Sequence, residues 1–158
     1  GEVVLCDLGA SMARVDLTMI GDAVNISARL ESACSKYGID NLVSSSVISD
    51  VENKFLYRTI DKILVKGKNK PVSCSELLSH FDKASKNEKL LANEFNAAFE
   101  EYSKGNFEMA KDMFGKSAQK ESIEKLSINP SIVYIDRCTQ LIESPPVNWD
   151  GVWAHESK

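Results

Sequence analysis

Residues 22–37 read DAVNISARLESACSKY and carry the clearest structural pattern in the chain. Apolar or aromatic side chains recur there at spacings of three or four residues, at Ala23, Ile26, Leu30, Ala33 and Tyr37. This period is typical of an amphipathic helix with one packed side. Asp22 is of a type favoured at the N-cap, and Gly38 is of the type favoured just after a helix. The pattern therefore predicts a helix from Asp22 to Tyr37.

The same stretch carries a second set of side chains with helical spacing. Its members are all polar: Asn25, Arg29, Ser32 and Lys36. Residues three or four apart on a helix are neighbours on its surface. We therefore expect one side of the helix to pack and the polar side to remain available for chemistry.

Short β-rich runs separated by turn residues surround this helix in the first half of the chain. The expected strands are Val3–Leu5, Leu42–Val43, Phe55–Tyr57 and Ile63–Val65. A second short helix is expected from about Ser46 to Asn53, between two of these strands. The order of elements predicts an α+β fold in which helices cover one face of a sheet.

The composition changes near residue 80, after which Ala, Glu, Lys, Leu and Phe dominate. We expect one domain over residues 1–80, a polar linker over 81–89, a helical module over 90–143 and a tail over 144–158. The aromatic and alanine spacing of this module resembles one tetratricopeptide-type repeat followed by half of another. Such a short piece buries too little surface alone, so it is expected to pack on the first domain or on a second subunit.

Three further features of this module are predicted from single residues. Pro130 is expected to open a last helix whose inward side chains are Ile132, Ile135, Cys138 and Leu141 or Ile142. The pair Pro145–Pro146 is expected to end it. Trp149 and Trp153 are expected to anchor the tail against the helices.

The composition of the 158 residues limits the classes of protein to be considered. The 43% hydrophobic and 27% charged residues indicate a soluble globular protein. The formal charge of −4 argues against nonspecific binding to nucleic acid or to an acidic membrane. No apolar run approaches the roughly 20 residues that a membrane-spanning helix needs. The chain begins with Gly1 rather than Met, so we expect it to be part of a longer protein.

Cysteine and histidine usage gives no sign of a zinc site. Cys6, Cys34, Cys74 and Cys138 are far apart, and the chain has only two histidines, His80 and His155. We interpret the cysteines as reduced thiols of a cytosolic protein, with Cys34 in the core.

Three ordered segments suggest a family. Residues 14–31 read RVDLTMIGDAVNISARLE, residues 37–44 follow, and residues 61–68 read DKILVKGK. In this order they closely resemble the signature of the catalytic domain of class III nucleotidyl cyclases, and residues 2–9 resemble the strand before that signature. The resemblance covers residues 1 to about 78. It implies the C-terminal half of a ferredoxin-like cyclase domain, followed here by the helical module.

The resemblance also implies roles for four residues. Asn25 would orient the ribose, and Arg29 would stabilise the charge that develops on the α-phosphate, a task that suits a planar guanidinium. Lys66 would neutralise the β- and γ-phosphates. Thr18 would meet the purine, and its hydroxyl, which can donate and accept, favours ATP over GTP. The implied product is cyclic AMP.

Mg²⁺ or Mn²⁺ is the implied cofactor, yet its ligands are expected outside this chain. In the family two aspartates hold two such ions, and Asp7, Asp16 and Asp22 do not match those positions. The family's active sites form between two subunits, so we expect a homodimer and no turnover by these residues alone. The parent protein is expected in the cytosol or as the cytosolic part of a membrane-attached protein.

Three alternatives stay open at this point. The chain could be a guanylate cyclase, an inactive cyclase-like domain that dimerises or regulates, or a helical-repeat adaptor. Retention of Asn25, Arg29 and Lys66 argues against the inactive domain. The hypothesis of a helical-repeat adaptor rests on residues 90–143 and does not explain the first half of the chain.

Overall fold

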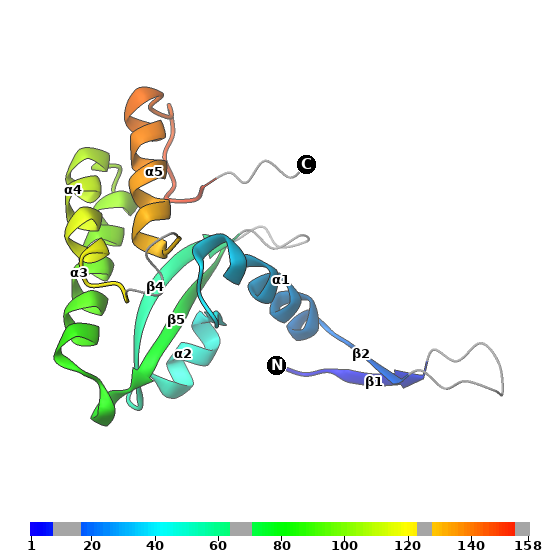
Figure 1. The fold of residues 1–158 in the computed structure, drawn as a ribbon. Coiled ribbons are helices and arrows are strands. Elements are labelled where there is room, and N and C mark those ends of the chain that lie inside the picture. Colours follow the sequence, from blue (N-terminus) through cyan, green and yellow to red (C-terminus); the bar gives the residue numbers. More distant parts are fainter. Residues whose placement is uncertain (8–16, 64–70, 123–127, 154–158) are drawn as a thin grey trace.

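The chain has a mixed α+β fold in which a helical layer covers one side of a small antiparallel sheet (Figure 1). The computed structural model describes residues 1–7, 17–63, 71–122 and 128–153. Along the chain the elements are β1 (Val4–Asp7), β2 (Leu17–Ile20), α1 (Asp22–Tyr37), β3 (Val43–Ser44), α2 (Ser45–Val51), β4 (Phe55–Ile63), β5 (Val72–His80), a 3₁₀ turn (Phe81–Lys83), α3 (Lys86–Ser103), α4 (Phe107–Ala118) and α5 (Pro130–Glu143). The predicted α+β class with a following helical module is confirmed.

The main sheet has three antiparallel strands in the order β3-β5-β4. The long β4–β5 ladder runs from the pair Phe55 and His80 to the pair Ile63 and Val72, with irregularities in register after Leu56 and Thr59. The predicted strand Phe55–Tyr57 is confirmed but is longer than expected, because β4 continues to Ile63. Of the predicted strand Ile63–Val65, only Ile63 belongs to the described residues. Strand β5 was missed because its centre is polar, and its Ser75 and Glu76 are nevertheless buried.

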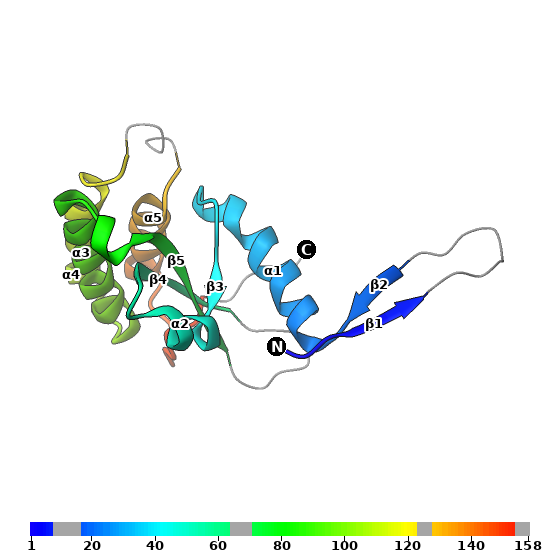
Figure 2. The same cartoon turned by 90° about the horizontal axis from the view of Figure 1, so that it is seen from below.

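The hairpin β1–β2 is a separate two-stranded sheet that projects away from the rest of the fold (Figures 1 and 2). Its register pairs Val4 with Ile20 and Asp7 with Leu17. The large apolar side chains exposed on and beside it are Val3, Val4, Leu5, Leu17, Met19 and Ile20. Residues that alternate across a strand point to opposite faces, so the hairpin is apolar on both sides.

Helix α1 has the predicted bounds, but its N-terminus differs from the expectation. The N-cap residue is Gly21 and Asp22 is the first helical residue, where its carboxylate lies favourably in the first turn. Glycine is required at position 21 because an added Cβ would lie 2.9 Å from the carbonyl oxygen of Glu2. The chain thus turns from the hairpin into α1 through a close backbone contact.

The other helices begin near the expected positions, with two shifts. Helix α2 starts at Ser45 and ends at Val51, slightly before the predicted Ser46 to Asn53. Helix α3 starts within the stretch 81–89, because Ser85 and Glu88 form a capping box. The polar segment between sheet and helices is therefore shorter than the predicted linker.

One hydrophobic core joins the sheet to the helical module. Its residues come from α1, β4, α3, α4 and α5 and include Tyr37, Ile60, Phe95, Phe99, Tyr102, Phe114 and Tyr134. Helix α3 packs along β4, and α4 lies between α3 and α5. The module therefore packs on the first part of the chain, the first of the two arrangements expected. Its likeness to a tetratricopeptide repeat and the exact domain limits stay predictions.

The inward face of α5 differs from the predicted one. Ile132 is exposed and Ile135 is only half-buried, whereas Tyr134, Cys138 and Leu141 are buried. The face is rotated because Tyr134 enters the core and its hydroxyl donates 2.7 Å to the carbonyl oxygen of Ile60. The prediction of Ile132 as a core residue was wrong.

The tail after α5 returns to the helices through Trp149. Its indole N–H donates to the carbonyl oxygen of Tyr102 at 2.9 Å, and its ring packs edge-on against Tyr102 and Phe107. The predicted anchoring role of Trp149 is confirmed.

Gly38 provides a test of how α1 ends. It has φ +62°, and an added Cβ would lie 2.4 Å from the carbonyl oxygen of Ile128. We expect Gly38→Ala to lower the free energy of unfolding by at least about 1–2 kcal/mol, from the left-handed backbone alone. Urea denaturation of the purified protein measures this.

Gly115→Ala is the matched control, since Gly115 lies within α4 and no atom lies within 4 Å of an added Cβ. It should raise the stability by about 0.5–1 kcal/mol. Equal effects of the two substitutions would contradict the described end of α1.

Candidate functional site

Helix α1 has a buried side and an exposed polar side. Leu30, Ala33 and Tyr37 are buried, whereas Asn25 and Arg29 are exposed. Four residues of helix separate Asn25 from Arg29, a rise of about 6 Å, so the two side chains leave the same surface one turn apart. Ser32 and Lys36 are also exposed. The predicted polar face is confirmed, and Asn25 and Arg29 share it.

Thr18 lies on β2, immediately before the turn into α1. It is half-buried and faces Cys6 across the hairpin register. Thr18 and Asn25 belong to consecutive elements, β2 and α1, which are joined through Gly21. Lys66 lies outside the described residues, and its relation to α1 stays a prediction.

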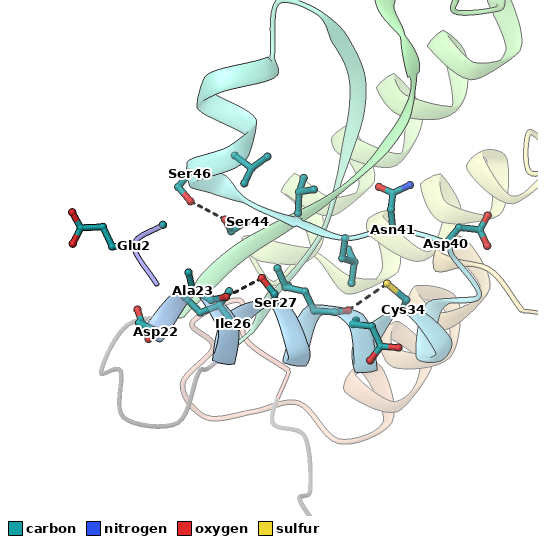
Figure 3. Close-up of a pocket in the computed structure, with 16 residues that line it drawn as sticks. Glu2, Asp22, Ala23, Ile26, Ser27, Cys34, Asp40, Asn41, Ser44 and Ser46 are labelled. Atoms are coloured by element: carbon teal, nitrogen blue, oxygen red, sulfur yellow. Dashed lines mark hydrogen bonds between the residues drawn. The ribbon is translucent and has the colours of Figure 1, made fainter. Parts of the chain in front are cut away.

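A pocket of about 820 Å³ lies along α1 (Figure 3), and its lining includes neither Asn25 nor Arg29. Its lining combines apolar side chains of α1 and the segment 42–47 with the carboxylates of Glu2, Asp22, Glu31 and Asp40. Its lining includes no Lys or Arg within the described residues. Four carboxylates disfavour a triphosphate, so we do not assign the nucleotide to this pocket.

The hydroxyl and thiol groups near this pocket are engaged locally. Ser27 donates to the carbonyl oxygen of Ala23 at 2.8 Å, and Cys34 donates to that of Leu30 at 3.3 Å (Figure 3). Ser44 and Ser46 share a hydrogen bond of 2.8 Å. These groups therefore stabilise the walls and offer no activated nucleophile.

A divalent metal does not fit the residues at hand. Across residues 1–7, 17–63, 71–122 and 128–153, no group of three or more His, Cys, Asp or Glu side chains could hold a metal ion. Hard cations need several converging oxygen ligands. Asp16 lies outside the described part, and Asp7 and Asp22 do not belong to such a group.

The four cysteines are free, as the sequence suggested. Cys74 and Cys138 are buried, and burial raises the pKa of each thiol to about 12. Both therefore stay protonated and unreactive at neutral pH. Cys34 is half-buried against the core.

Two buried ionic clusters were missed from the sequence. The first, which we call the Arg137 cluster, consists of Arg137, Asp61 and Tyr37. The guanidinium of Arg137 donates to Asp61 at 3.0 Å and to the Tyr37 hydroxyl at 2.9 Å, and that hydroxyl donates to Asp61. Arg137 comes from α5, Asp61 from β4 and Tyr37 from the end of α1.

The electrostatics of this cluster favour one protonation state. Burial is the largest cause that raises the pKa of Tyr37, followed by the charge of Asp61. Burial opposes the charged form of Arg137, but its tyrosine and aspartate neighbours outweigh that effect and raise the pKa of Arg137. Tyr37 therefore remains a neutral donor and Arg137 remains a cation.

The second, the Arg58 cluster, consists of Arg58, Glu76 and Glu121. Arg58 donates to Glu76 at 2.7 Å and to the two carboxylate oxygens of Glu121 at 2.6 and 3.2 Å. All three side chains are buried, and the guanidinium also lies over the ring of Phe95. This cluster ties the sheet to the connection after α4.

The sequence did hold one signal for Arg137. Tyr134, Arg137 and Leu141 follow the three-to-four spacing of a single helix face, so a cation lies on an otherwise apolar surface. The same test fails for Arg58 and Asp61, because the register irregularities of β4 interrupt the alternation of buried and exposed residues around them.

The comparison with known proteins finds relatives that are named adenylate cyclases. Over 80 residues, or 49% of this chain, it is 39% identical to an adenylate cyclase of Anabaena cylindrica. Over 136 residues, or 83% of this chain, it is 27% identical to a protein of Dictyostelium discoideum named adenylate cyclase, terminal-differentiation specific. The chain is related to adenylate cyclases.

The matches cover small parts of these relatives. The chain spans 16% of the Anabaena protein and 6% of the Dictyostelium protein. No family model matches the chain, and no solved structure matches it significantly. Among the helices that the structure describes, none is long and apolar enough to cross a membrane.

The exposure of Asn25 and Arg29 gives a direct test of their structural role. We expect Asn25→Ala and Arg29→Ala each to change the free energy of unfolding by no more than about 0.5 kcal/mol, as is usual for exposed positions. Leu30→Ala, on the buried side of the same helix, should cost about 2–5 kcal/mol. Thermal and urea denaturation of the three variants measures these values, and a large loss at Arg29 would mean that it holds the fold.

Proposed function

We propose that this chain supplies part of the active site of a class III adenylate cyclase, which converts ATP to 3′,5′-cyclic AMP and pyrophosphate. The similarity to two adenylate cyclases supports the family. The observation that carries the assignment of residues is the shared exposure of Asn25 and Arg29 on one surface of α1. An amide and a guanidinium one turn apart suit a ribose and an adjoining phosphate.

In the proposed reaction the ribose 3′-oxygen forms a bond to the α-phosphorus and the bond from that phosphorus to the pyrophosphate oxygen breaks. The 3′-hydroxyl releases its proton to solvent water, and pyrophosphate leaves with the electron pair of the broken bond. Asn25 holds the ribose for in-line attack, and Arg29 donates to the α-phosphate oxygens as charge builds up there. Lys66 neutralises the β- and γ-phosphates, and Thr18 contacts the adenine.

The divalent cations belong to this proposal, and their ligands lie outside the described residues. When bound, such ions supply charge neutralisation for the phosphates. The proposed second subunit completes the site. The apolar side chains of the β1–β2 hairpin, exposed on both of its faces, support coverage by another polypeptide segment.

A regulatory domain without activity is the second candidate. The exposed apolar hairpin is compatible with both candidates, because an active cyclase and an inactive regulatory domain would each need a surface for dimerisation. The two candidates differ only in whether Arg29 meets substrate.

Arg29→Ala in the full-length protein tests the proposed mechanism. We expect kcat to fall by about 10²–10³, the usual cost of losing one donor to a developing negative charge. KM for ATP should change little, because Arg29 acts mainly in the transition state. Cyclic AMP formation at varied ATP concentration measures both.

Lys36→Ala is the matched control, since Lys36 is an exposed cation on the same side of α1, seven residues further along. Its kcat should stay at the wild-type value. An Arg29→Ala protein with wild-type kcat would remove Arg29 from the mechanism and favour the regulatory domain.

Thr18 is tested by the choice of nucleotide. The wild-type protein should use ATP in preference to GTP, because the hydroxyl of Thr18 can accept from the exocyclic amine of adenine. Thr18→Val, of similar shape, should reduce the ratio of kcat/KM for ATP to that for GTP. A wild-type preference for GTP would assign the chain to guanylate cyclases instead.

A further inference from the structure

The end of α1 is attached to the helical module and not only to the sheet. Tyr37, the last residue of α1, is fully buried, and its hydroxyl contacts both Asp61 of β4 and Arg137 of α5. The next residue, Gly38, lies against the backbone of Ile128, just before α5. Two adjacent residues therefore connect α1 to a segment about 100 positions away.

The guanidinium of Arg137 is confined on several sides. It lies over the rings of Tyr134, Tyr37 and Trp153, at 4.8, 5.4 and 5.4 Å from their centroids. Its hydrogen bonds to Asp61 and Tyr37 fix its plane. An arginine held by charge, hydrogen bonds and stacking has little freedom, so it is a rigid support for Tyr37.

Arg29 lies on the same helix as Tyr37. It precedes Tyr37 by eight residues, or about 12 Å of helix. Ahead of Tyr37, the buried residues of α1 are Leu30 and Ala33, and the first two turns of the helix hold none. A tilt of α1 about its buried end therefore displaces Arg29 and, still more, Asn25, because the displacement grows with distance from Tyr37.

We infer that Arg137 and Tyr37 are positioning residues of the proposed cyclase: the helical module holds the end of α1 and thereby aims Asn25 and Arg29 at the nucleotide. This inference rests on the proposed function. It makes the helical module part of the catalytic unit. Neither residue touches substrate, and both act through α1.

Tyr37→Phe and Arg137→Lys in the full-length protein test the inference. The first removes one hydroxyl and keeps the ring, and the second keeps the charge but cannot serve both partners in one plane. We expect kcat for cyclic AMP formation to fall at least fivefold in each, with KM for ATP within twofold. Hydrogen exchange of the amides in residues 22–37, followed by mass spectrometry, should become faster in both.

Arg58→Lys is the matched control. Arg58 is equally buried and also links β4 to the helical module, but its hydrogen bonds go to Glu76 and Glu121 and not to α1. It should leave kcat and the exchange of residues 22–37 at wild-type values. Circular dichroism selects conditions in which all variants are folded.

Each outcome decides the inference. Loss of kcat together with faster exchange in Tyr37→Phe, absent in Arg58→Lys, supports it. A change in only one readout, wild-type behaviour of Tyr37→Phe, or an equal loss in Arg58→Lys overturns it. If the wild-type full-length protein makes no cyclic AMP, the proposed function fails, and the exchange of residues 22–37 alone decides whether the module holds α1.

Discussion

The buried contact of Arg137 with Asp61 and Tyr37 is the constraint on which this fold depends. Removing one partner of such a pair leaves an uncompensated charge in the interior, typically at a cost of about 3–5 kcal/mol. Hydrophobic packing alone would hold the sheet and helices together in several similar ways. A planar guanidinium that must donate to oxygen atoms of two different elements is compatible with far fewer arrangements of these elements. The Arg137 cluster therefore selects one arrangement of α1, β4 and α5.

The most accurate predictions from the sequence concern helices whose apolar residues recur every three or four positions. Helix α1 follows from the spacing of Leu30, Ala33 and Tyr37, and the exposure of Asn25 and Arg29 follows from the same period. The same spacing places Phe95, Phe99, Tyr102 and Phe114 of α3 and α4 in the core. The buried side of a helix can be predicted from a single sequence, because the spacing of apolar residues within that helix determines it.

The parts that escaped prediction depend on distant residues. Strand β5 places Ser75 and Glu76 in the interior because Arg58 of β4 meets Glu76 there. Nothing near Glu76 in the sequence shows that partner. Tyr134 likewise rotates the inward face of α5 towards Ile60, and Ile132 is exposed as a result. Lys66 lies outside the described residues, and its place in the site stays a prediction.

The separation between the partners of the Arg137 cluster also affects how the chain is made. Asp61 and Arg137 are 76 residues apart, and at typical rates of synthesis the ribosome needs about 4–15 s to add that length. During this interval the carboxylate of Asp61 has not yet met the guanidinium of Arg137. The sheet therefore gains this contact with the helical module only after α5 has emerged from the ribosome.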